Sequence, residues 1–171
     1  MSFFLSLKNL HLLLMKNLTL LRILPMVFMM LWLSGCGGHL SRAKKVEMVV
    51  QTARSYTGTP YKYGGTTRVG IDCSALLYHS YQSIKITLPR VSIDQSKKGR
   101  RVNMKDLQVG DMVFFATGKK KRQINHAGIV TAVRGRNDVR FIHASTSLGV
   151  TESNLYSNYY KERFRRARRV L

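Results

Sequence analysis

The sequence lacks an apolar run long enough to cross a lipid bilayer. The apolar run from Ile23 to Leu33 has eleven residues, with Pro25 inside it, whereas a bilayer core requires about 20 residues. Residues 1–35 also lack acidic side chains and carry three cationic ones before the run. A basic stretch before a short apolar run is typical of a secretory signal peptide, so residues 1–35 are predicted to be a cleaved signal.

A cysteine follows the predicted signal peptide, in the segment Leu33-Ser34-Gly35-Cys36. Small residues before this cysteine resemble a bacterial lipobox, which predicts that Cys36 is acylated and becomes the mature N-terminus. An uncleaved membrane anchor or a chance cysteine is the alternative. Gly37 stands where an aspartate would favour the inner membrane, so a lipid anchor in the outer membrane, facing the periplasm, is expected. Met15 is a second candidate for the start codon.

Cysteine is scarce, because Cys36 and Cys73 are the only two in the sequence. If a lipid occupies Cys36, Cys73 has no partner within the chain, and a disulfide framework is excluded. An unpaired thiol in an oxidising compartment is open to oxidation, which suggests that Cys73 has a chemical task. A buried and inert cysteine is the alternative.

The cysteine and histidine residues also lack the paired spacing of a zinc site, so neither a metal nor another cofactor is predicted. Acidic residues are few: 8 stand against 29 lysines and arginines, for a net charge of +21. Without Lys8, Lys16 and Arg22 of the signal the net charge is +18.

Nucleic acid is a common partner of so basic a chain, but no recognition motif or base-stacking array is present, and no nucleic-acid partner is predicted. Anionic wall polymers and lipid headgroups are the expected partners, with an attraction that weakens as salt rises. A basic surface that only aids solubility is the alternative.

No internal repeat or low-complexity tract divides the rest of the chain. Residues 36–43 are predicted to be a lipidated tether, and residues 44–171, roughly 128 in number, are enough for one domain with its own core. Apolar residues at helical spacing predict a helix over residues 44–56, and Asp72 is a candidate N-cap for a second helix that ends near residue 83. Residues 87–101 are expected to be irregular.

Three runs dense in Val, Ile and Phe follow the predicted helices. They predict strands over residues 111–116, 126–133 and 139–144, with a hairpin loop at 134–138. Residues 160–171 have apolar residues at helical spacing, but residues 166–171 could instead form a closing strand. Helices followed by strands predict an α+β domain, with N-terminal helices packed on an antiparallel sheet.

Cys73 falls at the first turn of the second predicted helix. A thiol reacts as thiolate, and the helix dipole and a histidine within hydrogen-bond reach would both lower the pKa of Cys73. The free backbone N–H groups of a helix start could also hold a tetrahedral oxyanion.

Two histidines lie on the two strands of the predicted hairpin. His126 is proposed as the general base and His143 as the residue that fixes its tautomer and orientation. The register that would place both on one face is not fixed by the sequence, and a structural role is the usual one for either histidine alone. His79 lies six positions after Cys73, so it is expected to lie at the rim, away from the sulfur.

Six segments together resemble the NlpC-type cell-wall cysteine peptidases, in the order found in that family. The resemblance covers residues 44–171 and looks strongest to the Spr-like murein endopeptidase lipoproteins, which are single catalytic domains behind a lipobox. The segments are Tyr61-Lys62-Tyr63-Gly64-Gly65, Asp72-Cys73-Ser74, Leu88-Pro89-Arg90, Val109-Gly110-Asp111-Met112-Val113-Phe114-Phe115, Asn125-His126-Ala127-Gly128-Ile129 and His143-Ala144-Ser145.

The resemblance implies a papain-like α+β fold and hydrolysis of peptide bonds in peptidoglycan stem peptides or cross-links. It implies Cys73 as nucleophile, His126 as base and His143 as third residue. Tyr61 would help at the oxyanion through its hydroxyl, with loop packing as the alternative, and Ser74 through its backbone. A non-catalytic wall-binding or scaffold protein, and acyl transfer by the same thiol, are the competing functions.

The chain departs from the family pattern in three places. Ala75 replaces a glycine and Val91 replaces a hydroxyl residue, two changes that bear on substrate contacts. The hairpin between His126 and His143 is longer than usual, which bears on how closely the two rings approach.

Overall fold

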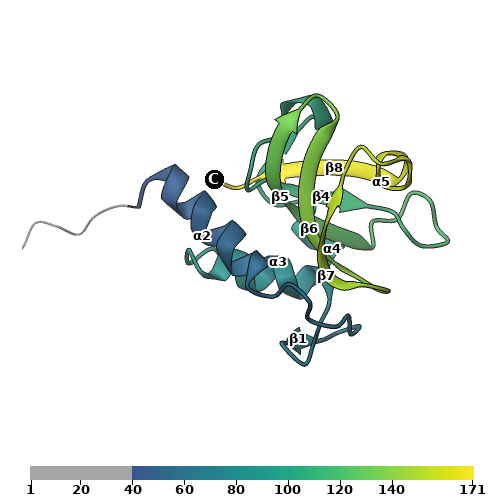
Figure 1. Ribbon diagram of the computed structural model, residues 1–171, viewed down its shortest axis with the longest axis horizontal. Coiled ribbons are helices and arrows are strands. Elements are labelled where there is room, and N and C mark those ends of the chain that lie inside the picture. Colours follow the sequence, from purple (N-terminus) through teal and green to yellow (C-terminus); the bar gives the residue numbers. More distant parts are fainter. Residues whose placement is uncertain (1–39) are drawn as a thin grey trace, which may run out of the picture. The chain divides into compact units, whose positions relative to one another are not determined.

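The computed structural model describes residues 40–171 (Figure 1). The predicted signal peptide, the acylation candidate Cys36 and most of the predicted tether lie outside these residues. None of the helices between residues 40 and 171 has the length and apolar character needed to cross a membrane.

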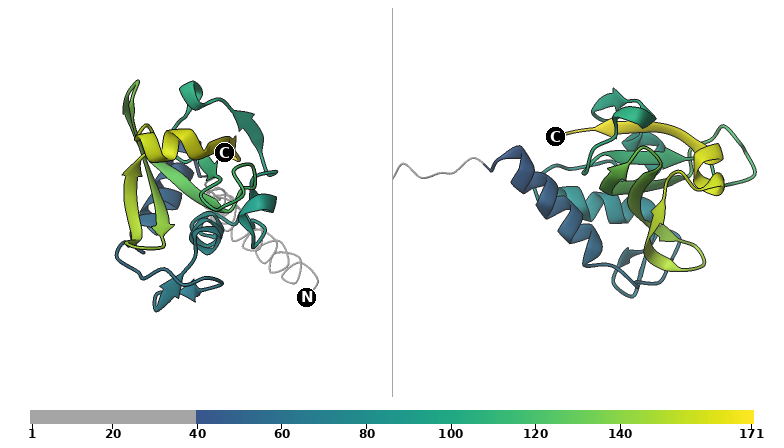
Figure 2. Two further views of the ribbon diagram at one scale, coloured as in Figure 1. Left: turned by 90° about the vertical axis from the view of Figure 1, so that its right-hand side faces the viewer. Right: turned by 45° about the horizontal axis from the view of Figure 1, so that its top comes forward.

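Two helices form the N-terminal layer of the described residues. Helix α2 (Arg42–Arg54) is capped by the Ser41 hydroxyl and begins two residues earlier than predicted. Helix α3 (Cys73–Gln82) begins directly after Asp72. The two helices lie side by side, and both contact the sheet (Figure 2).

Six strands form one antiparallel sheet in the order β3-β8-β4-β5-β6-β7. Their bounds are Arg100–Val102 (β3), Met112–Phe115 (β4), His126–Gly135 (β5), Asp138–Ser145 (β6), Gly149–Asn154 (β7) and Phe164–Arg169 (β8). The three predicted strands are β4, β5 and β6. The ambiguous C-terminal segment contains both alternatives, because residues 160–163 are helical and residues 164–169 form β8, between β3 and β4. The result is the α+β architecture that the sequence predicted.

Short elements connect these layers. The bounds are Thr66–Thr67 (β1), Gly70–Ile71 (β2), Ser92–Gln95 (α4), Met104–Asp106 (η1) and Asn158–Arg163 (α5). Helix α4 and strand β3 fall within or at the end of residues 87–101, which were expected to be irregular. A helix of four residues is too short to produce a periodic apolar pattern, so α4 could not be predicted from apolar spacing.

Both faces of the sheet are buried. All four residues of β4 are buried, and alternate ones point to opposite faces. Met112 and Phe114 share a core with Cys73 and other residues of α2 and α3. Phe115, on the opposite face, packs in a second core with Tyr160 from α5. The candidate site lies where these two cores meet at the start of β5.

Candidate active site

Asp72 and the first turn of α3 position the Cys73 side chain. The Asp72 carboxylate caps the helix by accepting a hydrogen bond from the Ala75 backbone N–H at 2.8 Å. This cap makes Cys73 the first helical residue and leaves unpaired N–H groups and the positive end of the helix dipole beside its sulfur. The side chain is buried, 6% exposed, and its thiol is free.

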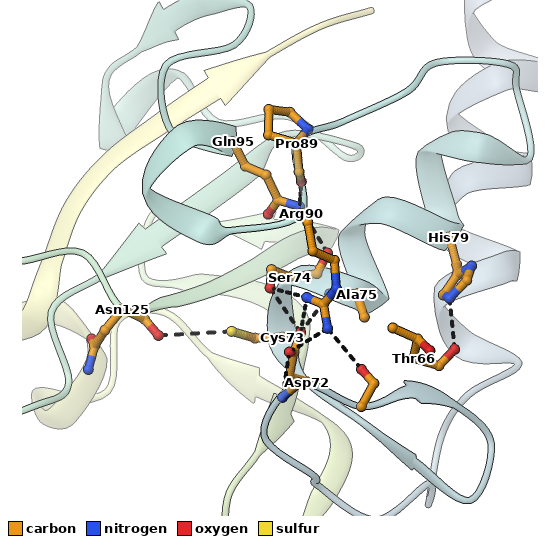
Figure 3. Close-up of polar contacts among 12 residues, drawn as sticks. Thr66, Asp72, Cys73, Ser74, Ala75, His79, Pro89, Arg90, Gln95 and Asn125 are labelled. Carbon is orange, nitrogen blue, oxygen red and sulfur yellow. Dashed lines mark hydrogen bonds and ion pairs between the residues drawn. The ribbon is translucent and has the colours of Figure 1, made fainter.

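The Cys73 thiol lies against the backbone on either side of His126. Its Sγ is 4.0 Å from the Asn125 backbone oxygen, to which the thiol donates (Figure 3). Burial raises the pKa of Cys73 to about 11, although a hydrogen bond from the Ala127 backbone N–H acts in the opposite direction. In this resting geometry the sulfur is therefore a neutral thiol that is hydrogen-bonded to the backbone.

His126 and His143 contact each other directly. Nε2 of His126 and Nδ1 of His143 are 2.9 Å apart. Ile129 pairs with Ile142, so continuing the antiparallel ladder sets Gly128 opposite His143 and His126 on the same face, two residues away. The long hairpin does not keep the rings apart, because its additional residues extend β5 and β6 beyond the pair.

Both imidazoles are buried among aromatic side chains. The His143 ring is 1% exposed and stacks on Phe141, with ring centres 4.9 Å apart. Burial lowers the pKa of His126 to about 4. Burial, followed by the charge of His126, lowers the pKa of His143 to about 3. Both rings are therefore neutral near pH 7, and each carries one ring proton.

A cavity of about 400 Å³ opens beside the thiol, and Cys73, Tyr61 and Ser74 are among its lining residues. Burial, followed by the charges of Cys73 and Asp72, raises the pKa of Tyr61, so its hydroxyl keeps its proton. The backbone N–H of Ser74 makes a hydrogen bond that lowers the pKa of the thiol. The two residues predicted to assist at the oxyanion thus share the cavity with the sulfur.

An ion pair holds the turn before α3, and sequence analysis assigned no role to its arginine. Arg90 Nη2 is 2.7 Å from Asp72 Oδ2, and Arg90 Nη1 donates to Ser74 Oγ at 2.8 Å (Figure 3). Burial alone would raise the pKa of Asp72. Hydrogen bonds from Arg90, Ala75 and Ser74 outweigh burial and hold the pKa of Asp72 below its ordinary value. The segment Leu88-Pro89-Arg90 is one of the six that resemble the family, but the pairing of Arg90 with Asp72 could not be read from the sequence.

The short helix α4 supports the same turn. Gln95 is fully buried. Its Nε2 donates to the backbone oxygen of Ser74 at 2.9 Å and to that of Pro89 at 2.8 Å (Figure 3). The segment 87–101 therefore does more than connect α3 to the sheet, because it fixes the backbone just after the thiol.

Two hydroxyl groups contact the second nitrogen of His143, and sequence analysis named neither. Ser153 Oγ, on β7, is 3.0 Å from His143 Nε2, and the Tyr160 hydroxyl, on α5, is 3.2 Å from it. Phe141 pairs with Ser153 across β6 and β7, which sets Ser153 diagonal to His143 on the same face. Both hydroxyls and both histidines line a second cavity of about 460 Å³.

The Asn125 side chain closes the loop before β5. Its Oδ1 accepts hydrogen bonds from the Thr117 backbone N–H at 2.8 Å and from the Thr117 hydroxyl at 3.2 Å. Between these two residues the loop carries four exposed cationic side chains, Lys119, Lys120, Lys121 and Arg122. This Thr117–Asn125 clamp holds the backbone that meets the thiol.

His79 contacts other parts of the domain, in agreement with the prediction that it lies away from the Cys73 sulfur. Its Nε2 is 2.9 Å from the Thr66 backbone oxygen (Figure 3), and its ring stacks on Tyr56. Among residues 40–171, no three His, Cys, Asp or Glu side chains come together as a metal site would need. The structure thus brings the two imidazoles together and sets the thiol against the Asn125 backbone, but among residues 40–171 no hydrogen bond joins the Cys73 sulfur to either ring.

Comparisons with known proteins give consistent matches. Residues 58–169 match the model of the NlpC/P60 family. The chain is 35% identical over 150 residues to "Probable endopeptidase NlpC" of Escherichia coli (strain K12), which covers 82% of this chain and 94% of that protein. It is 38% identical over 117 residues to "Murein DD-endopeptidase MepS/Murein LD-carboxypeptidase" of the same strain, which covers 68% of this chain and 58% of that protein.

A solved structure shows the same fold. It is the crystal structure of an NlpC/P60 family protein from Bacillus cereus, with a TM-score of 0.64 and 31% identity, over 72% of this chain and 39% of that one. The chain thus spans less than two thirds of the length of several of its relatives. The shared part contains the helices and the antiparallel sheet of the papain-like α+β fold.

Proposed function

The chain belongs to the NlpC/P60 family, and from that premise we propose that it is a peptidoglycan hydrolase, a murein endopeptidase that cleaves peptide bonds of stem peptides or cross-links. One observation carries the proposal: the Cys73 thiol meets the backbone at the strand start where His126 bonds to His143. A nucleophile next to a base, with a third group orienting that base, is the arrangement that acyl transfer needs. Two relatives from E. coli are named as endopeptidases, which supports the choice of bond.

In the proposed reaction His126 is the general base. Its Nε2 faces His143, so its Nδ1 is the nitrogen left for the thiol. In this conformation the thiol is bonded to the Asn125 oxygen and not to the ring, so the reaction requires the sulfur to leave that oxygen and approach Nδ1 before the proton can pass. The thiolate then attacks the substrate carbonyl carbon. As the C–N bond breaks, His126 returns the proton to the leaving amine, and a thioester remains on Cys73.

Water completes the proposed cycle. His126 accepts a proton from the water as its oxygen attacks the thioester, and the sulfur leaves as thiolate and regains that proton. The Ser74 backbone N–H and the Tyr61 hydroxyl are the proposed donors to the oxyanion in both steps. Preorganised donors of this kind typically contribute about 10²–10³ in rate. His143 holds the base in place.

The test is digestion of purified peptidoglycan, followed by mass spectrometry of the released fragments. The wild-type protein is expected to release muropeptides, and the Cys73→Ala variant is expected to release none. His79→Gln is the matched control, because His79 lies outside the site, and it should keep wild-type release. Release by Cys73→Ala would show that the assignment of the nucleophile is wrong. The fragment masses identify the bond that is cut.

A non-catalytic wall-binding or scaffold protein is the second candidate. The thiol's hydrogen bond to the Asn125 oxygen, and its pKa near 11, favour this reading. Alkylation by iodoacetamide separates the two functions, because only a thiolate reacts quickly. A hydrolase should show a Cys73 alkylation rate that is already high near pH 6. A rate that rises only at strongly alkaline pH, with peptidoglycan binding intact, would favour the binding protein.

We also propose a lipid anchor on Cys36, which places the enzyme at the outer membrane, facing the periplasm. The proposal rests on the short apolar run and the small residues before Cys36. The Cys36→Ser variant is expected to lose radiolabelled palmitate and to leave the membrane fraction, whereas Cys73→Ser should keep both. A Cys36→Ser protein that remained labelled would contradict the anchor.

A further inference from the structure

We propose that Ser153 is a positioning residue that selects the base-competent tautomer of the His126–His143 pair, with Tyr160 as a second acceptor. The inference rests on the proposed function, in which His126 takes the proton of the thiol. Three contacts carry it: the 2.9 Å contact between the rings, and the two hydroxyl contacts to His143 Nε2 at 3.0 Å and 3.2 Å.

The two rings share a single proton at their contact. In one arrangement Nε2–H of His126 donates to Nδ1 of His143, and His126 Nδ1 is left bare and basic. In the other, Nδ1–H of His143 donates to Nε2 of His126, and the proton of His126 then lies on Nδ1. A protonated Nδ1 cannot accept from the thiol, so only the first arrangement supports general-base chemistry.

The hydrogen-bond partner of His143 Nε2 decides which of the two arrangements forms. In the competent arrangement His143 carries its proton on Nε2 and needs an oxygen that accepts it. Ser153 Oγ is the nearer of the two oxygens, at 3.0 Å, and the Tyr160 hydroxyl is the second, at 3.2 Å. In the incompetent arrangement one of these hydroxyls would have to donate instead.

The surroundings favour acceptance by the hydroxyls. Ser153 and Tyr160 both line the 460 Å³ cavity beside the ring. The Ser153 hydroxyl also donates a hydrogen bond to the Tyr160 oxygen, so its hydrogen points away from the ring and its lone pairs remain for the His143 N–H. A serine oxygen is a better acceptor than a phenolic oxygen, whose lone pairs are partly delocalised into the ring. The principal acceptor is therefore Ser153.

The heavy atoms of this relay have little freedom to move. The His143 ring stacks on Phe141 and meets the edge of Tyr160 at a ring-centre distance of 5.3 Å. The β6–β7 ladder fixes Ser153 opposite Phe141. Gly128 packs against the same ring, because a Cβ atom there would lie 2.5 Å from the Phe141 ring. With the rings held in this way, the positions of the protons are the remaining variable.

The test uses variants that change one hydroxyl at a time. Ser153→Ala removes the principal acceptor, Ser153→Thr retains a hydroxyl in a residue suited to a strand, and Tyr160→Phe keeps the packed ring. We expect Ser153→Ala to lower kcat about tenfold with little change in KM, and the double variant Ser153→Ala/Tyr160→Phe to lower it about 100-fold, by analogy with the losses of about 10–100-fold that follow removal of the hydrogen-bond partners of metal-bound histidines. Ser153→Thr should recover most of kcat.

Nitrogen-15 NMR of the histidine rings provides a readout that a merely structural role would not move. In the wild-type protein the chemical shifts should show His126 Nδ1 without a proton and His143 Nε2 with one. The double variant should show a mixture of tautomers. The melting temperature of the Tyr160→Phe variant is the control that shows whether packing is preserved.

A wild-type spectrum with the proton on His126 Nδ1 would overturn the proposal. So would a double variant that kept kcat within twofold of wild type. The NMR measurement needs no substrate, so it tests the tautomer even if the wild-type protein failed to hydrolyse peptidoglycan. Failure of the relay and failure of the proposed function are therefore distinguishable.

Discussion

The two sides of the candidate site are held together by different interactions. The thiol wall, formed by Asp72, Ser74, Arg90 and Gln95, depends on an ion pair, on hydrogen bonds to the Asp72 carboxylate and on a hydrogen bond from Gln95 to the Ser74 backbone oxygen. The histidine wall, formed by His126, His143, Ser153 and Tyr160, is neutral and polar, with both histidines buried and both hydroxyl residues half-buried. Fixed charges hold the helix start that must not move, whereas neutral groups with exchangeable protons stand where the proposed reaction moves a proton.

The largest expected effect comes from breaking the histidine wall at His126. We expect His126→Gln to lower kcat/KM by about 10³, or about 4 kcal/mol of barrier, because general-base catalysis contributes about 10²–10⁴. The measurement is the rate of muropeptide release, with His79→Gln as the control. A His126→Gln protein that kept a tenth of the wild-type rate would show that the base lies elsewhere.

Acid should weaken the histidine wall more than the thiol wall. Unfolded histidines take up protons below their ordinary pKa near 6.5, whereas the folded rings remain neutral until about pH 4 and pH 3. The contribution of the two neutral rings to the free energy of unfolding is therefore fully present above pH 6.5. It falls as the pH falls, by about 2 kcal/mol per ring at pH 5. The measurement is urea unfolding at pH 7 and pH 5.

The same experiment on His143→Gln sharpens this prediction. One titrating ring is removed, so the loss of unfolding free energy between pH 7 and pH 5 should be smaller by about 2 kcal/mol. An equal loss in the variant and the wild type would mean that other groups cause the acid sensitivity.

The smallest effect is expected on the thiol wall. Arg90→Met leaves the Asp72 carboxylate without its cation, and the Arg90 side chain is 39% exposed while that of Asp72 is 9% exposed. A pair between the surface and buried limits should contribute about 1–2 kcal/mol to unfolding free energy at pH 7. The exposed pair of Arg140 with Asp138 is the control, and Arg140→Met should change stability by less than about 0.5 kcal/mol. Equal changes in the two variants would contradict a special role for Arg90.

Local patterns predicted the parts of the fold that depend on local physics. Asp72 before an apolar stripe predicted the start of α3 because an N-cap acts within one turn. Dense β-branched and aromatic runs predicted β4, β5 and β6. The C-terminal segment stayed ambiguous because its choice of strand depends on pairing with β4, which is more than forty residues away.

The site itself was only partly predictable. Family motifs pointed to Cys73, His126 and His143, and the structure brings the two imidazoles into contact. Their catalytic roles remain proposals. Ser153 and Tyr160 could not be named in advance, because their distances to His143 depend on the β6–β7 register and on the placement of α5.

The Thr117–Asn125 clamp has a consequence for how this domain can be altered. Because the two ends of the loop are joined by the Asn125 side chain, residues 119–123 can change in length or composition while the start of β5 stays in place. Gly118 is the exception, because a Cβ atom there would lie 2.6 Å from Asn125 Nδ2. A recognition module can therefore be inserted into this loop, by evolution or by design, without moving the residues of the candidate active site.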